Sequence, residues 1–249
     1  MQPLTEQEPL VSVVIPNYNH AQYVADAIES VLAQTYRRFE VIVVDDGSTD
    51  NSREVIARFG DAVRCIHKKN AGLSAARNTG IEASSGALIG VLDADDMYVP
   101  EYIGTLVSRL VAEPDAGGVY CGYRFVDHLD NDLPHVEARA IDHRKLYEAL
   151  LDGNFLVPES MFLLREVYDS VGLFDEALGA CEDWDVWLRA AKSFKILHTT
   201  ELLTRHRVLP GSMSSDPVRM LTNRMTVLGK HLGAEPESAG GTLAHRAFS

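Results

Sequence analysis

The chain has 249 residues, of which 46% are hydrophobic and 24% charged, a balance typical of a globular protein with one sizeable core. Its formal net charge of −13 argues against a protein that binds nucleic acid, because such binding depends on Lys and Arg side chains that neutralise phosphates. Cys65, Cys121 and Cys181 are widely spaced, so neither a zinc knuckle nor a disulfide framework is predicted.

The N-terminal residues show no export signal. They lack the basic region and the apolar region of a signal peptide, and no run in the sequence has the apolar length of a membrane span. We therefore expect a cytoplasmic protein with reduced thiols.

The first half of the chain alternates between strand and helix patterns. Apolar runs at residues 11–15, 41–44 and 87–92 are rich in β-branched residues, as in strands that are buried on both faces. Helical spacing follows Asn19 to Gln22 and Asn51 to Glu54, two pairs that predict capping boxes. This alternation predicts an α/β fold with a Rossmann-like, mostly parallel central sheet that is flanked by helices.

Polar motifs follow each of these three strands. They are Asn17-Tyr18-Asn19, Asp45-Asp46-Gly47-Ser48 and Asp93-Ala94-Asp95-Asp96. Ligands of parallel sheets bind beyond the carboxyl ends of the strands, so we expect these motifs to share one site.

The acidic run at residues 93–96 indicates a cation. Three carboxylates within four residues repel one another in a partly desolvated site, and all-oxygen ligands suit Mn²⁺ or Mg²⁺ that also binds substrate phosphates. A solvated acidic turn that caps a helix explains the same run without a metal.

The second half has a looser pattern. Residues 119–123 and 160–164 resemble strands, and Glu182 to Lys192 resembles a helix whose first turn carries Asp183. Apolar residues follow Asp183 on the same helical face, so desolvation of its carboxylate could shift the pKa to suit a general base. Acidic residues in a first helical turn also interact favourably with the helix dipole, which explains these acids without a catalytic role. We expect residues 98–216 to form the smaller half of the same domain as residues 1–97, with Tyr120, Tyr123, Arg124 and Glu159 among its candidate contact residues.

The end of the chain carries basic residues. Arg205-His206-Arg207 precedes a flexible loop that either clamps a diphosphate or is simply exposed. Residues 217–232 predict an amphipathic helix, and the residues after it a mobile tail, in a C-terminal segment at 217–249. The helix either contacts an anionic membrane, or packs on the core or on a second subunit of a homodimer.

Five segments in order, VSVVIPNYN, VVDDGSTD, GLSAARNTGI, DADD and EDWDVWLR, resemble the family 2 glycosyltransferases, over most of residues 11–214. The resemblance implies a GT-A fold and an inverting enzyme that moves one sugar from a nucleoside-diphosphate sugar of the UDP or dTDP type to an acceptor hydroxyl. The acceptor is expected to be a glycan, a lipid-linked molecule or a small molecule, as in polysaccharide biosynthesis. The resemblance then implies that residues 1–97 are the nucleotide-sugar-binding half, and residues 98–216 the acceptor-side and catalytic half, of one domain.

The residues and the resemblance together predict site roles. Asp183 is the expected general base, with Glu182 beside it, and Asp95 is the expected metal ligand, with Asp93, Asp96 and His206 around it. Nucleotide-sugar contacts are expected from a larger set of residues: Pro16, Tyr18, Asn19, Asp45, Asp46, Arg77, Asp93, Ala94 and Arg207.

Two departures from the family pattern leave alternatives open. Leu209 stands where a loop histidine is expected, which keeps open a catalytically inactive protein that binds sugar nucleotides. The sequence also lacks the Gln-x-x-Arg-Trp motif of processive synthases, so transfer of a single sugar is predicted.

Overall fold

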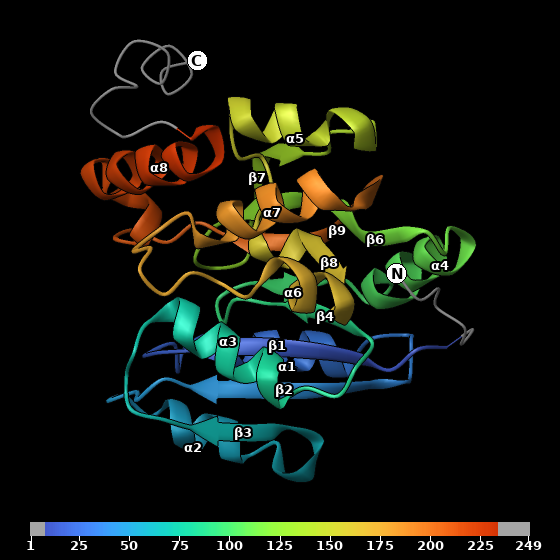
Figure 1. Cartoon of the computed structure of the whole chain (residues 1–249). Helices are drawn as coiled ribbons and strands as arrows, with labels where there is room; N and C mark the ends of the chain where they lie inside the picture. Colours follow the sequence, from blue (N-terminus) through green and yellow to red (C-terminus); the bar gives the residue numbers. More distant parts are fainter. Residues whose placement is uncertain (1–7, 234–249) are drawn as a thin grey trace.

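The computed structural model describes residues 8–233 and builds them around one nine-stranded sheet (Figure 1). The strand order is β3-β2-β1-β4-β8-β6-β9-β5, with β7 paired to β6. Residues 1–7 and the predicted tail from residue 234 lie outside the described part. No helix in the described part is both long and apolar enough to cross a membrane.

The N-terminal half forms the parallel part of the sheet. Its strands are β1 (Val11–Asn17), β2 (Phe39–Asp45), β3 (Arg64–His67) and β4 (Leu88–Val91), and its helices are α1 (Val24–Leu32), α2 (Ser52–Ala57) and α3 (Leu73–Ala83), with a short 3₁₀ turn η1 (Gly60–Ala62). Strands β1 and β4 are buried throughout, as their apolar runs predict. Helix α3 packs closely on β1 and β2, because Gly80 lies directly over the side chains of Val14 and Val44.

The C-terminal half continues the same sheet with mixed pairings. It contains β5 (Met97–Tyr98), α4 (Tyr102–Ala112), β6 (Ala116–Val126), β7 (Asp132–Glu137), α5 (His143–Asp152), η2 (Pro158–Ser160), β8 (Met161–Leu164), α6 (Arg165–Val171), α7 (Glu182–Ser193), β9 (Lys195–Arg207), η3 (Met213–Ser215) and α8 (Pro217–Leu232). Strand β8 is antiparallel to both β4 and β6, while β6 and β9 are parallel. The predicted α/β class is confirmed, but the sheet is mixed: β3-β2-β1-β4 and β6–β9 pair in parallel, and the other pairings are antiparallel.

Several local expectations need correction. Neither predicted capping box forms, since α1 begins at Val24 without a side-chain cap and Asn51 makes no cap hydrogen bond to α2. Residues 205–207, which precede the predicted loop, are the last residues of the long strand β9. The predicted helix at 217–232 is confirmed as α8, which begins with Asp216 as its N-cap and Pro217 in its first turn.

Candidate active site

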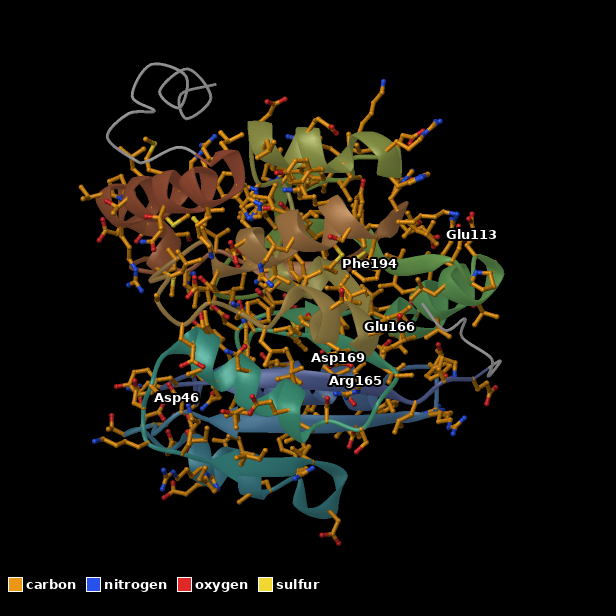
Figure 2. All side chains as sticks on the ribbon, in the orientation of Figure 1. Asp46, Glu113, Arg165, Glu166, Asp169 and Phe194 are labelled. Atoms are coloured by element: carbon orange, nitrogen blue, oxygen red, sulfur yellow. The ribbon has the colours of Figure 1, made fainter. Side chains whose placement is uncertain are left out.

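The predicted polar motifs meet at one edge of the sheet. Asn17, the last residue of β1, pairs in register with Asp45 of β2, and the backbone N–H of Asp46 donates to the carbonyl of Asn17 over 2.9 Å. Asp93 to Asp96 follow β4, the parallel neighbour of β1 on its other side. Figure 2 shows Asp46 at this edge, on the opposite side of the molecule from Glu113.

Asp45 braces the turn after β2. Its buried carboxylate accepts hydrogen bonds from Arg53 Nε at 2.7 Å, His67 Nδ1 at 3.2 Å and the Ser48 N–H at 3.2 Å. Burial acts to raise the pKa of Asp45, but these hydrogen bonds outweigh it and the pKa is lowered. All of these contacts are to protein groups, so the nucleotide contact predicted for Asp45 stays a prediction.

Asp46 connects this turn to helix α3. Its carboxylate accepts from the backbone N–H groups of Ala71 at 3.1 Å and Gly72 at 2.8 Å, and it forms an ion pair with Lys68 at 3.3 Å. Asp46 is 2% exposed, whereas Tyr18 is 45% exposed. The Tyr18 ring is therefore accessible to a ligand, which a side chain that stacks on a base requires.

Two other predicted nucleotide contacts have structural roles as well. Asn19 adopts a left-handed conformation (φ 57°) and its Oδ1 accepts from the Thr49 N–H at 2.7 Å, which joins the loop after β1 to the turn after β2. Pro16 lies buried within β1, next to Val44 of β2.

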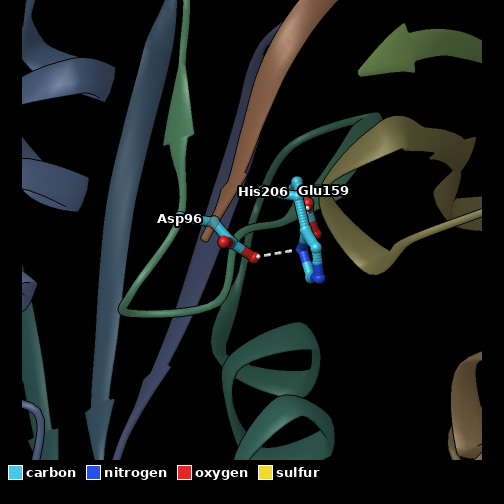
Figure 3. Close-up of side chains that lie close together, drawn as sticks. All are labelled: Asp96, Glu159 and His206. Atoms are coloured by element: carbon cyan, nitrogen blue, oxygen red, sulfur yellow. Dashed lines mark hydrogen bonds and ion pairs between the residues drawn. The ribbon is translucent and has the colours of Figure 1, made fainter. Parts of the chain in front are cut away.

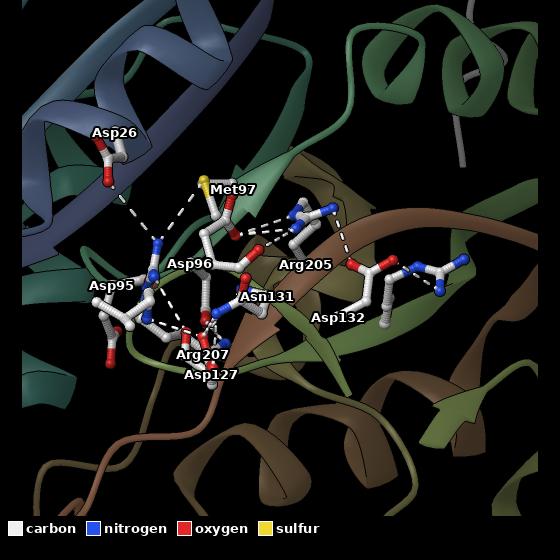
Figure 4. Close-up of polar contacts among 12 residues, drawn as sticks. Asp26, Asp95, Asp96, Met97, Asp127, Asn131, Asp132, Arg205 and Arg207 are labelled. Atoms are coloured by element: carbon white, nitrogen blue, oxygen red, sulfur yellow. Dashed lines mark hydrogen bonds and ion pairs between the residues drawn. The ribbon is translucent and has the colours of Figure 1, made fainter. Parts of the chain in front are cut away.

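The three carboxylates of residues 93–96 have different partners. Asp93 accepts from Arg77 at 2.7 and 2.9 Å. Asp96 is buried and accepts from the Arg207 N–H at 2.6 Å and from His206 Nδ1 at 3.2 Å. The Asp95 carboxylate has no hydrogen-bond or ion-pair partner among residues 8–233, although the Asp95 carbonyl accepts from Arg207 Nε at 2.8 Å (Figure 4).

Asp95 is consequently the carboxylate of this group that lacks a counter-charge. Burial, followed by the charges of Asp96 and Asp93, raises its pKa to about 7. A divalent cation would supply the missing positive charge, so the residues at this position fit a metal.

His206 bridges two buried acids. Its Nδ1 lies 2.9 Å from Glu159 Oε1 and 3.2 Å from Asp96 Oδ2, and ligand atoms of the three residues lie within 4.8 Å of one another (Figure 3). Burial and then the charge of Glu159 raise the pKa of Asp96 to about 7, while both acids raise the pKa of His206 against the opposing effect of burial. Glu159 is 0% exposed, so its side chain is not accessible for the contact with an acceptor that the sequence predicted.

The other candidate acceptor residues are also engaged. The Tyr120 hydroxyl accepts from the Ile141 N–H at 3.0 Å, the Tyr123 hydroxyl donates to the Phe155 carbonyl at 3.2 Å, and Arg124 pairs with Asp132.

Arg207 is held by the protein rather than exposed for a ligand. Its side chain is almost fully buried, lies over the ring of Tyr23 at 4.9 Å, and donates to the carbonyls of Asp95 and Asp127. It therefore fixes the backbone next to Ala94 and Asp95, and its predicted contact with the nucleotide sugar stays a prediction.

Arg77 joins the two acidic motifs that the sequence places far apart. Its buried guanidinium donates to Asp93 through one terminal nitrogen and to Glu182 through the other, at 2.5 Å. It also lies 5.2 Å from the centre of the Phe174 ring. With both terminal nitrogens engaged, Arg77 holds β4's acidic loop and the start of α7 in one cluster.

Asp183 stands in the first turn of α7, next to this cluster. Burial and the neighbouring charge of Glu182 raise its pKa to about 7, against the opposing charge of Arg77. Asn154 Nδ2 donates to Asp183 Oδ2 at 3.2 Å, and the Leu156 N–H donates to Asn154 Oδ1, which fixes the orientation of that amide. The sequence analysis missed Asn154, because a lone asparagine carries no motif.

A cavity of about 190 Å³ lies beside these acids. It is lined by Gly72 and Ser74 of α3, Glu176 and Glu182, Met213 of the loop after β9, and Arg219 of α8. A larger cavity of about 420 Å³ lies between α5 and the end of α7. None of the predicted site residues lines that larger cavity, so we assign no part of the site to it.

Known proteins share the sequence pattern and the fold of this chain. The family model described as Glycosyl transferase family 2 matches residues 12–172. An uncharacterized glycosyltransferase of Rickettsia typhi is 34% identical over 210 residues, which cover 80% of this chain and 64% of that protein. The chain thus spans less than two thirds of that relative's length.

Two solved structures share the fold. TarS 1-349 of S. aureus in complex with UDP-GlcNAc matches 89% of this chain and 71% of that chain, with a TM-score of 0.70 and 19% identity. The mannosyltransferase PcManGT of Pyrobaculum calidifontis in complex with GDP-Man and Mn²⁺ matches 96% of this chain and 69% of that chain, with a TM-score of 0.71 and 20% identity. The predicted GT-A fold is confirmed by these two neighbours.

Proposed function

Because this chain belongs to glycosyl transferase family 2, we propose that it transfers one sugar, with inversion, from a nucleoside-diphosphate sugar to an acceptor hydroxyl. The observation that carries the proposal is a pair of carboxyl groups with raised pKa in different surroundings. Arg77 forms ion pairs with both Asp93 and Glu182. Asp95 follows Asp93 in the chain and forms no ion pair with residues 8–233, whereas Asp183 follows Glu182 in the first turn of α7. Their different surroundings support different roles.

Asp183 is the proposed general base. Its pKa of about 7 lets the carboxylate take up a proton near neutral pH. In the proposed step, the acceptor oxygen attacks the anomeric carbon from the face opposite the nucleoside diphosphate. The new carbon–oxygen bond forms as the bond to the phosphate oxygen breaks, and the hydroxyl proton passes to Asp183. One displacement of this kind inverts the anomeric centre.

Asp95 is the proposed ligand of Mn²⁺ or Mg²⁺. The metal, when bound, would stabilise the negative charge that develops on the departing diphosphate. Asp93 stays ion-paired to Arg77, and Asp96 and His206 bind each other, so in this proposal they hold the loop that presents Asp95. The Mn²⁺ in the PcManGT complex supports a metal in this fold.

The donor is proposed to be of the UDP or dTDP type, with Tyr18 stacking on the base. The UDP-GlcNAc bound to TarS and the GDP-Man bound to PcManGT support a nucleoside-diphosphate sugar as the class of donor. A thermal-shift screen of UDP, dTDP and GDP, each with and without Mn²⁺, tests this. A stabilisation by UDP or dTDP that needs Mn²⁺ is expected, and a stabilisation by GDP alone among the three would refute the assigned base.

An acceptor that is lipid-linked would bring the protein to a membrane. Helix α8 exposes Val218 and Leu221 at 73% and 42%, while its Val227 and Leu228 are buried against the core. The exposed residues support a peripheral contact. Co-sedimentation with anionic liposomes, compared between the chain and its Val218→Ser/Leu221→Ser variant, tests the contact; equal sedimentation would remove it.

A further inference from the structure

Helix α7, which carries Asp183 in its first turn, starts from a strained residue. Cys181, at the N-cap position, has φ 61° and lies in the left-handed region, where a side chain other than glycine costs about 1–3 kcal/mol. Cys181 also supplies no side-chain cap to α7. The start of this helix therefore depends on contacts from elsewhere.

Helix α8 supplies contacts just before the base. Gly179 N–H donates to Asn223 Oδ1 at 2.9 Å, and the Gly179 carbonyl accepts from Arg219 Nε at 2.8 Å. Asn223 Nδ2 donates to the Arg219 carbonyl, so the amide keeps its oxygen toward Gly179. Both polar backbone groups of Gly179 are thus bound by neighbouring turns of one helix.

The same helix supplies contacts just after the base. Asp185 is buried, and its Oδ1 accepts from Lys230 at 2.8 Å and from His231 Nε2 at 3.2 Å. Lys230 reaches back to Asp175 at 2.8 Å, at the beginning of the loop that leads to the base. Side chains of helix α8 therefore bind the chain on both sides of Glu182 and Asp183.

We propose that α8 is the positioning element of the catalytic base, and that Arg219 and Asn223 are positioning residues that act through Gly179. This inference rests on the proposed function, since it takes Asp183 as the base. It also extends beyond the matched family region, which ends at residue 172.

Hydrogen–deuterium exchange tests the positioning without any substrate. The variant Arg219→Ala/Asn223→Ala should exchange faster than the unmodified protein in peptides that cover residues 176–184, and should keep its exchange in β1 and β2. Thr226→Ala is the matched control, because Thr226 is exposed on α8 and bonds only to the Thr222 carbonyl of its own helix. Unchanged exchange at residues 176–184 in the double variant would overturn the proposal.

Kinetics test whether the positioning reaches the base. With UDP-glucose, UDP-GlcNAc and GDP-mannose as probes, release of nucleoside diphosphate in Mn²⁺ gives kcat and the donor KM. The double variant should lose about tenfold or more in kcat with little change in donor KM, since a small displacement of a catalytic group costs up to about 10²-fold. The single variant Asn223→Asp keeps an acceptor for the Gly179 N–H and should therefore retain most of the wild-type kcat.

The same substitutions in an Asp183→Asn background separate the two proposals. If α8 acts through Asp183, the double substitution lowers the residual rate no further. An equal further loss in that background would refute positioning of the base. If Asp183→Asn alone leaves the rate unchanged, Asp183 is not the general base and the proposed mechanism is wrong. The exchange experiment would still report whether α8 orders residues 176–184.

Discussion

Arg77 binds Glu182 across a separation of 105 residues in the sequence, at 2.5 Å, in a buried site where it also binds Asp93. This one guanidinium neutralises two carboxylates that would otherwise repel each other and Asp183. Its positive charge also opposes the rise in the pKa of Asp183 that burial and Glu182 cause.

Loss of Arg77 should unfold the site. The substitution Arg77→Met leaves Asp93 and Glu182 without their cation, and removal of one partner from a buried ion pair costs about 3–5 kcal/mol. Urea denaturation should show the loss as a lower midpoint. Arg144→Met, which removes an exposed side chain that pairs with Asp142, should leave the midpoint unchanged and serves as the control. A midpoint equal to the control would contradict the prediction.

The rate should depend on pH through Asp183. A base must be ionised to accept a proton, so activity should rise with pH and level off above about pH 7, the pKa to which burial and Glu182 raise this carboxyl. Initial rates between pH 5.5 and 8.5 measure this limb. The residual rate of Asp183→Asn should lack it. A wild-type rate that is flat across this range would assign the base to another group.

Asp183 should also make the free energy of unfolding depend on pH, but this free energy should fall as pH rises, whereas the rate rises. The pKa of Asp183 is about 7 in the folded state and about 3.9 in the unfolded chain, so its contribution is fully present below about pH 4 and is lost as pH rises toward 7. Asp183→Asn should therefore be more stable than the wild type at pH 8, by at least about 1 kcal/mol, the value of one pKa unit. The two proteins should match at pH 4. Equal urea midpoints at pH 8 would contradict the raised pKa.

The sequence predicts the parallel strands and their motifs because their signals are local. Apolar runs such as Val11 to Ile15 identify buried strands, and parallel pairing then brings Tyr18, Asp46 and Asp93 to one edge without further information. The start of α7 at Glu182 and the bounds of α8 were predicted for the same reason.

The partners of the acids could not be predicted, because they come from distant segments. His206 carries no strand signal in the sequence, yet it lies in β9, which pairs with β6, and its partner Glu159 lies 47 residues away. Asn154 reaches Asp183 across 29 residues. Local spacing in a single sequence cannot predict contacts between such distant residues.

Asn154 should tune the base. Its amide donates to Asp183 Oδ2 and so favours the ionised carboxylate. Asn154→Ala should move the acidic limb of the rate profile upward by about half a unit to one unit, since a hydrogen bond to a charged group contributes about 1.5–3 kcal/mol when buried and less at this exposed position. Asn51→Ala, an exposed asparagine without a cap bond, is the control. An unshifted limb in Asn154→Ala would show that the amide does not act on the base.

The His206 cluster should hold the site together. His206→Ala leaves buried Asp96 and Glu159 facing each other without a cation, so the folded state should lose about 3–5 kcal/mol at neutral pH. His206→Ala combined with Asp96→Asn and Glu159→Gln removes the charges as well and should recover part of that loss. Urea denaturation of the two variants measures the difference. If both variants lose the same stability, the charges of the cluster are not the cause.

Asp95 should separate metal binding from folding. Because burial and neighbouring charges raise its pKa to about 7, Asp95→Asn removes an unfavourable ionisation and should raise the thermal stability of the metal-free protein at pH 8. The same variant should lose the stabilisation that UDP gives in the presence of Mn²⁺. Undiminished Mn²⁺-dependent binding of UDP in Asp95→Asn would move the metal to another residue, and full activity in excess EDTA would remove the metal from the mechanism.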